Sequence, residues 1–301
     1  APNVQIGNET AELAGQFMLR IRAFEGKPLD EVAAAVDKAF AKFEAEGIPD
    51  KDLNRIKAGL ETRFYSSVSS VLGKSALLAE YNYLNGNPGY VSEGVRKTLA
   101  VSAADVRRVY ATYIKGKPFV ATSFVPKGKL ALALSGSGKA EVVEEKVVQG
   151  AENAVDTSAN AAYTKTPSAF DRSKEPAYGA TPEVKVPQVW DTTLSNGMRV
   201  VGIENREVPL VQFDIAIDGG LLLDRLDKVG VANLMARMMT QGTATKTPQE
   251  LEEAILQLGA TINVAARTED VRISVTTLAR NYDATLALVE EILLQPRWDE
   301  K

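Results

Sequence analysis

The stretch GVANLMARMM, residues 230–239, has the outline of a helix, and three of its positions have the spacing of a metal site. Positions i, i+3 and i+4 lie on one side of a helix. In the pattern H-x-x-E-H, two imidazoles at i and i+4 hold zinc, and the glutamate at i+3 activates a water molecule. Here these positions hold Asn233, Ala236 and Arg237, which can neither replace the imidazoles nor take a proton.

The chain of 301 residues contains no histidine and no cysteine. Zinc sites built on imidazole or thiolate ligands are therefore excluded, and so are the Ser-His-Asp and Cys-His arrangements of nucleophilic catalysis. Carboxylates, lysine, tyrosine, serine and threonine remain as candidate acids, bases or nucleophiles. We therefore expect no imidazole or thiolate metal ligand on this chain.

The charge balance excludes other function classes. The formal net charge is −4, with hydrophobic residues at 45% and charged residues at 25%, as in ordinary globular proteins. Nucleic-acid binding needs a clustered surplus of lysine and arginine, and a membrane span needs about 20 consecutive apolar residues. Neither is present, so we expect no nucleic-acid partner and no membrane span.

Residues 1–130 show the periodicities of both strands and helices. Apolar residues alternate over 17–23, which predicts a half-buried strand, and recur with helical spacing in three later stretches. Ser102 and Asp105 have the spacing of a capping box, which marks the start of the third helix. The predicted elements are a strand over 17–23, helices over 29–46, 53–64 and 103–113, and a strand over Phe119–Val125.

Residues 131–187 differ in composition from the segments on either side. They are rich in alanine, serine, glycine, lysine, threonine and proline and carry few large apolar side chains. Such a stretch buries too little apolar surface to form a core. We therefore predict a long linker with one short element around 141–148.

Residues 188–301 predict a second compact unit. Asn196-Gly197 between two extended runs predicts a hairpin, and Thr247, Pro248 and Glu250 supply the cap of a helix. The remaining pattern is a strand over 211–217, the helix at 230–239, strands over 262–266 and 271–275, and a helix over 281–295. The fold class predicted is α+β, with two layered domains in which helices pack on an antiparallel sheet, joined by the linker.

The helix at 230–239 has two sides. Its i, i+3, i+4, i+7 positions are apolar and predict the buried side, formed by Val231, Leu234, Met235 and Met238. The other side, with Asn233, Ala236, Arg237 and Thr240, is then expected to face solvent.

The order of short motifs in 188–301 resembles the N-terminal unit of the pitrilysin, insulysin and mitochondrial processing peptidase family of zinc metallopeptidases. The motifs that carry this resemblance are L-x-N-G at 194–197, Gly219-Gly220, Asp224, Gly230-Val231-Ala232, Gly242-Thr243, the cap at 247–250, Leu258-Gly259-Ala260 and Leu294-Gln295-Pro296.

The resemblance assigns a role to each of the three positions with zinc spacing on the helix at 230–239. In that family the residue after the Gly-x-Ala step is the first zinc histidine, which corresponds to Asn233; the glutamate base then falls on Ala236 and the second histidine on Arg237. All three are substituted, so the resemblance implies a degenerate, non-catalytic half, and we expect no catalytic residue, no metal ligand and no cofactor on this chain. The family's third ligand, a distant glutamate, is expected beyond Lys301.

The resemblance also places the other segments. It implies that 1–130 is the C-terminal part of the second domain of one peptidase half, 131–187 the tether between halves, and 188–301 the N-terminal domain of the second, inactive half. Zinc and peptide hydrolysis are then expected on the active half, either upstream or on a homologous partner subunit. Peptide substrates are also expected to contact the inactive half, and Arg237 is a candidate contact residue. Fused bacterial members are often exported, which favours the periplasm over the cytoplasm.

Two alternatives remain open on the sequence alone. The first is a non-enzymatic assembly subunit of the same fold, like the core proteins of respiratory complexes. The second is a peptide-binding module that uses exposed sheet edges.

Overall fold

The computed structural model describes residues 2–11, 13–139, 141, 171, 173–175, 177–181, 183 and 186–299. The described residues mix helices with small antiparallel sheets, which confirms the α+β class. Contacts group residues 1–135 with 205–301 in one compact unit and residues 136–204 in a second. The domain boundaries predicted from the sequence, at 130 and 187, stay a prediction.

The N-terminal segment opens with a two-stranded antiparallel ribbon of β1 (Asn3–Thr10) and β2 (Gly15–Arg22). The register pairs Val4 with Ile21 and Ile6 with Leu19, so that the apolar side chains share one face. The alternation over 17–23 predicted β2 correctly, whereas β1 was not predicted because its neighbouring polar residues weaken the pattern.

Five helices follow in the described part of this segment: α1 (Leu29–Glu46), α2 (Asp50–Ser67), α3 (Val71–Asn85), α4 (Tyr90–Ala100) and α5 (Ala103–Tyr113). The helix α1 ends at Gly47, which has a positive φ of 75°, as the sequence predicted. The predicted capping box of Ser102 and Asp105 starts α5. Helices α3 and α4 were not predicted, and a short 3-10 turn at Leu130–Leu132 closes the segment.

The strand predicted over Phe119–Val125 is wrong. Residues 117–126 form neither helix nor strand, and the side chains of Phe119 and Phe124 are 86% and 95% exposed. An alternating apolar run becomes a strand only when a neighbouring strand pairs with its backbone. Among the described residues this run has no such neighbour.

The second unit contains a hairpin of β3 (Val189–Thr193) and β4 (Arg199–Ile203). The turn between them is the predicted one, because Gly197 takes a φ of 87° and its N–H donates to the carbonyl of Leu194 at 2.9 Å. The short element predicted around 141–148 lies almost wholly outside the described residues.

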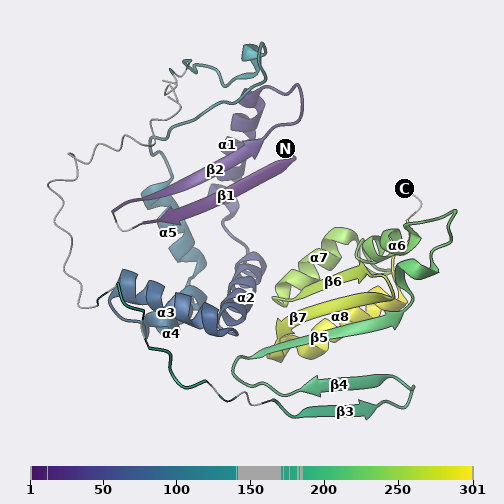
Figure 1. Ribbon diagram of the computed structural model, residues 1–301. Helices are drawn as coiled ribbons and strands as arrows, with labels where there is room; N and C mark the ends of the chain where they lie inside the picture. The colour runs from purple at the N-terminus through teal and green to yellow at the C-terminus, as the bar shows by residue number, and fades with distance from the viewer. Residues whose placement is uncertain are drawn as a thin grey trace, which may run out of the picture. The chain divides into compact units, whose positions relative to one another are not determined.

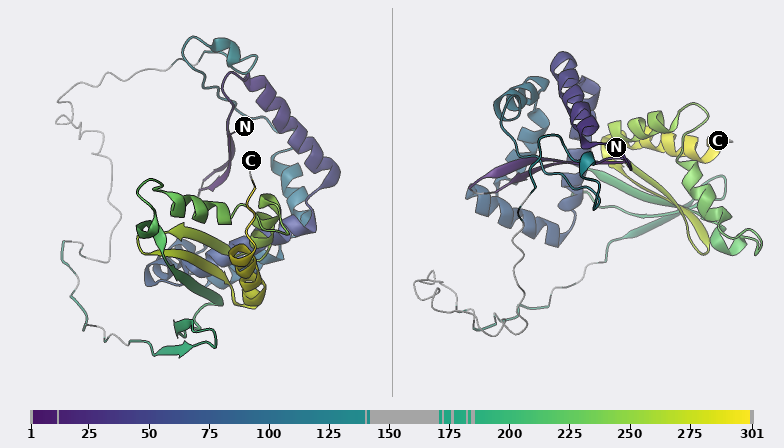
Figure 2. Two further views of the ribbon diagram at one scale, coloured as in Figure 1. Left: turned by 90° about the vertical axis from the view of Figure 1, so that its right-hand side faces the viewer. Right: turned by 90° about the horizontal axis from the view of Figure 1, so that it is seen from above.

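The C-terminal segment is built on the antiparallel sheet β5-β7-β6, whose strands span Leu210–Asp218 (β5), Thr261–Ala266 (β6) and Asp270–Leu278 (β7). The three strands lie side by side in every view (Figure 1, Figure 2). The register sets Ile215 and Val264 on either side of Ile273, so one face of the sheet is apolar.

Three helices cover this apolar face: α6 (Val231–Met239), α7 (Pro248–Gln257) and α8 (Tyr282–Leu294). The core centres on Leu251, Ile273 and Ile292, each at most 1% exposed. The predicted capping box starts α7, with Pro248 in its first turn. None of the helices in the described part combines the length and the apolar composition needed to cross a bilayer.

Candidate functional site

The chain enters the candidate site through a tight turn after β5. Gly220 is buried with a φ of 77°, and a Cβ on it would lie 2.3 Å from the carbonyl oxygen of Arg267. The N–H of Leu221 donates to this same carbonyl at 2.9 Å. The glycine is therefore needed so that the 3-10 turn η4 (Gly220–Leu223) can pack against the connection between β6 and β7.

Asp224 holds the N-terminus of α6. Its carboxylate accepts hydrogen bonds from the N–H of Gly230 at 2.7 Å and the N–H of Ala232 at 3.0 Å. Two N–H groups that would otherwise lack partners at the helix start are satisfied by an anion placed at the positive end of the helix dipole. The sequence marked Asp224 only as part of a motif, and this role became visible only with the tertiary structure.

Glu291 on α8 holds the loop that follows α6. Its carboxylate accepts hydrogen bonds from the buried Thr243 hydroxyl at 2.5 Å, from the Lys246 ammonium at 2.6 Å and from the Thr245 hydroxyl. These donors, the lysine first, lower the pKa of Glu291 to about 2. No local pattern predicts this cluster, since 45 to 48 residues separate Glu291 from its partners.

The buried side of α6 differs from the predicted one. The buried residues are Ala232, Ala236 and Met239, whereas Val231 is 51% exposed and Leu234 59% exposed. The predicted core stripe is therefore wrong. The physical reason is that the two small alanines let the helix backbone come close to the sheet, while the larger side chains lie on the opposite side.

Because the buried side of α6 differs from the predicted one, the three positions with zinc spacing do not share one exposed face. Asn233 and Arg237 are exposed, but Ala236 is 2% exposed and belongs to the core. The expectation that Ala236 faces solvent is corrected: its methyl group packs within the core.

The donor set at these positions does not fit zinc. An asparagine amide is a weak neutral donor, a buried methyl group offers no ligand, and the guanidinium of Arg237 stays positively charged and repels a cation. Across the described residues, no three or more Asp or Glu side chains converge in a way that could hold a metal ion. No hydrolytic step can be derived from these residues.

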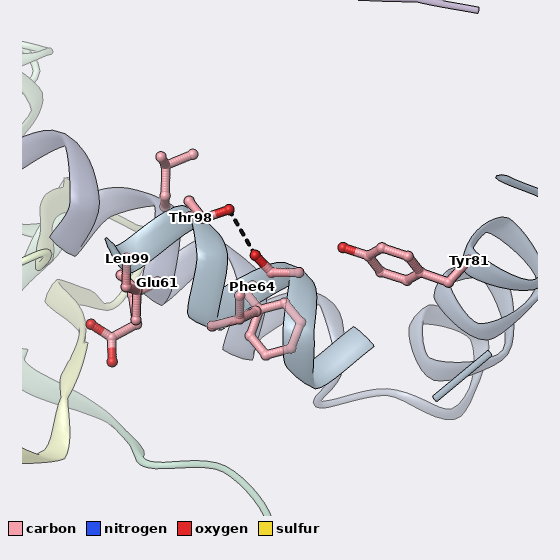
Figure 3. Close-up of a pocket in the computed structure, with 8 residues that line it drawn as sticks. Glu61, Phe64, Tyr81, Thr98 and Leu99 are labelled. Carbon is pink, nitrogen blue, oxygen red and sulfur yellow. Dashed lines mark hydrogen bonds between the residues drawn. The ribbon is translucent and has the colours of Figure 1, made fainter. Parts of the chain in front are cut away.

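A small hollow between α2, α3 and α4 lies away from α6 (Figure 3). It has a volume of about 130 Å³ and is lined mainly by Leu60, Phe64, Val95 and Leu99. Inside it the Thr98 hydroxyl donates to the carbonyl of Gly94 at 3.0 Å. The hollow is smaller than the 300–1,000 Å³ typical of small-molecule sites, so α6 remains the better candidate.

One known family matches the C-terminal segment. The family profile described as "Insulinase (Peptidase family M16)" matches residues 199–301, about a third of the chain. We call these residues the M16 segment, after the family that their sequence matches. The resemblance stated from the motifs is thereby confirmed, and the M16 segment runs from β4 through the end of α8, with α6 inside it.

Curated proteins similar to this chain include peptidase subunits and a non-peptidase homologue. The chain is 26% identical over 118 residues to the probable mitochondrial-processing peptidase subunit beta of Arabidopsis thaliana, covering 39% of this chain and 22% of that protein. It is 26% identical over 101 residues to the "Non-peptidase homolog YmxG" of Helicobacter pylori, covering 34% and 23%. It is 27% identical over 106 residues to mitochondrial-processing peptidase subunit alpha of Neurospora crassa, covering 35% and 18%. The chain thus spans about a fifth of the length of these relatives.

Solved structures similar to this chain include a peptidase M16 inactive domain from Pseudomonas fluorescens, with 24% identity and a TM-score of 0.35, covering 37% of this chain and 27% of that one. A protease from Helicobacter pylori shows 22% identity and a TM-score of 0.35, covering 38% and 28%.

Proposed function

We propose that this chain is a non-catalytic portion of a zinc metalloendopeptidase homologue. In this proposal it helps to enclose and bind peptide substrates, while the active half, on another part of the protein or on a homologous subunit, carries zinc and hydrolyses the peptide bond. The relatives named as processing-peptidase subunits support the peptidase setting, and the relative named as a non-peptidase homologue supports a half that has lost catalysis.

The observation that carries the proposal is the composition of the exposed side of α6. Arg237 lies there one helical turn from Asn233 and from the exposed side chain of Leu234. Within the described part of the chain, the Arg237 guanidinium has neither an ion pair nor a hydrogen bond. A cation beside an apolar side chain suits a peptide, because guanidinium N–H groups donate to carbonyls and carboxylates while Leu234 covers an apolar side chain.

The first expectation concerns metal and activity. The purified chain should contain zinc at no more than about 0.1 equivalent and should hydrolyse no peptide between pH 5 and 9, because α6 lacks both zinc ligands and a general base. Elemental analysis and a quenched-fluorescence peptide assay measure the two properties. Stoichiometric zinc that survives chelation would overturn the assignment of Asn233, Ala236 and Arg237 to degenerate positions.

The second expectation concerns peptide binding. The full chain should bind unstructured acidic peptides saturably, and Arg237→Ala should weaken this binding about 5- to 10-fold, since it removes one charged hydrogen-bonding contact. Fluorescence anisotropy of a labelled peptide gives the Kd. Arg108→Ala, which removes an exposed arginine from α5, is the matched control and should change the Kd less than twofold.

An assembly or scaffold role is the alternative, and the relative named as a non-peptidase homologue favours it. A scaffold of this kind should show no saturable peptide binding, and Arg237→Ala should then behave like the control. The same titration therefore separates the two functions.

A further inference from the structure

Helix α2 packs against the turn that ends α7, although the two lie in different segments of the chain. The hydroxyl of Thr62 donates to the carbonyl of Gly259 at 2.7 Å, and both groups are buried. The side-chain amide of Gln257 donates to the carbonyl of Lys51 at 2.9 Å. Each segment thus satisfies backbone carbonyls of the other, which a chance surface contact seldom does.

The contact requires a glycine at its centre. Gly259 has a φ of 61°, and a Cβ there would lie 2.7 Å from the carbonyl of Ala58 and 2.8 Å from the Thr62 hydroxyl. The backbones of the two segments therefore approach as closely as their atoms allow. Leu53 and Ala58 are buried on the same helix, so α2 also contributes apolar area.

A nearly buried carboxylate on α2 pairs with an arginine of the C-terminal segment. Glu61 is 8% exposed and accepts two hydrogen bonds from the guanidinium of Arg280, at 2.8 Å and 2.6 Å. Arg280 lies in the 3-10 turn η5 (Ala279–Asn281) of the C-terminal segment. The planar, two-bonded geometry fixes the orientation of the segments as well as adding affinity.

We infer that these contacts form a docking interface that holds residues 1–135 and 205–301 together without the chain between them. We call it the α2–α7 interface; its residues are Lys51, Ala58, Glu61, Thr62, Gln257, Gly259 and Arg280. The intervening residues 136–204 form a separate contact unit and contribute none of these bonds. If the proposed function holds, the α2–α7 interface joins the two peptidase halves, but the inference itself does not depend on peptide binding.

The test cuts the full chain rather than expressing its parts. A site for a sequence-specific protease is inserted within residues 151–160, and the cleaved protein is run on size-exclusion chromatography with light scattering at micromolar concentration. The two fragments should elute as one 1:1 complex with the mass of the intact chain. Two separate peaks from the cleaved protein would overturn the inference.

Two substitutions show whether the α2–α7 interface is responsible. Arg280→Glu places two carboxylates together and should raise the fragment Kd at least tenfold, and it should leave the uncleaved chain folded because Arg280 is 57% exposed. Thr62→Val removes the buried hydroxyl with little change in volume and should raise the Kd about 3- to 10-fold. Arg297→Glu, at an arginine paired with Asp299, is the matched control and should change it less than twofold.

Circular dichroism of each uncleaved variant verifies that it is folded. Equal Kd values for Arg280→Glu and Arg297→Glu would contradict the assignment of the α2–α7 interface. Peptide titration of the uncleaved chain, with Arg237→Ala as the test variant and Arg108→Ala as its control, reports on the proposed function separately.

Discussion

Replacing Ala236 by glutamate is expected to lower the free energy of unfolding by about 3–5 kcal/mol, or to prevent folding. The substitution restores the residue that the family resemblance places there. In this chain, however, Ala236 is 2% exposed and packs with the core around Ile273 and Ile292. A carboxylate at this position would be buried without a partner in a space that fits a methyl group. Urea unfolding followed by circular dichroism measures the loss.

The control for this substitution is Asn233→His, at another of the three positions. Asn233 is exposed, so the change should alter the free energy of unfolding by no more than about 0.5 kcal/mol. A loss below about 1 kcal/mol for Ala236→Glu would mean that α6 can turn its side chains away from the core. Substitution alone would then place all three side chains of the zinc motif on one exposed face. The buried position of Ala236 contradicts that outcome.

Replacing Glu291 by glutamine is expected to destabilise the chain by about 2–3 kcal/mol at pH 7. Its pKa falls from an ordinary value of 4.5 to about 2, with hydrogen bonds from Lys246, Thr243 and Thr245 as the causes, and such a fall corresponds to roughly 3 kcal/mol. Glutamine keeps the shape of the side chain but loses the charge opposite Lys246. Thermal or urea unfolding of both proteins gives the difference.

The pH dependence of that difference carries a definite sign. Because the pKa of Glu291 is lower in the folded chain than in the unfolded one, its stabilisation is fully present above about pH 5. It is lost as the pH falls from about 4.5 to about 2, so the gap between wild type and Glu291→Gln should close over this range. Glu290→Gln, at the exposed neighbour on α8, should leave a gap of less than about 0.5 kcal/mol throughout. A gap that stays constant down to pH 2.5 would rule out a special role for the Glu291 carboxylate.

The expectations for Ala236 and Glu291 both concern α6, because Ala236 lies on this helix and Glu291 binds the loop that follows it. Asp224 binds the start of α6, and Glu291 binds the loop that leaves its end. Held at both ends, α6 keeps one orientation, with Arg237 exposed and Ala236 buried. Such fixed placement is what a binding surface needs from its scaffold. The helix α6 is therefore held firmly in place, although the residues on it cannot bind zinc.

Much of the secondary structure followed from the sequence alone, because its signals are local. The capping boxes at Ser102 and Thr247, the turn at Gly197 and the helix stop at Gly47 each depend on residues a few positions apart, and each prediction is confirmed. The absence of histidine and cysteine likewise excluded imidazole and thiolate zinc sites without any structure.

The errors arose where partners are distant in sequence. The largely apolar run at 119–125 is typical of a strand, but pairing depends on a neighbour that the run itself does not specify. Helix α6 has two sides that periodicity can separate, yet periodicity cannot say which side meets the sheet. Two alanines, not the larger Val231 and Leu234, face the core because the backbone of α6 packs closely against β6.

For the candidate site, too, some features follow from the sequence and others only from the fold. The sequence by itself determined that Asn233, Ala236 and Arg237, which have the i, i+3, i+4 spacing of a zinc motif, can hold no zinc, because residue type alone decides ligand chemistry. Only the tertiary structure decided that Ala236 is core while Arg237 is exposed, and that Asp224 and Glu291 hold the helix. Burial and long-range hydrogen bonds depend on which elements pack together, and that is a property of the whole fold.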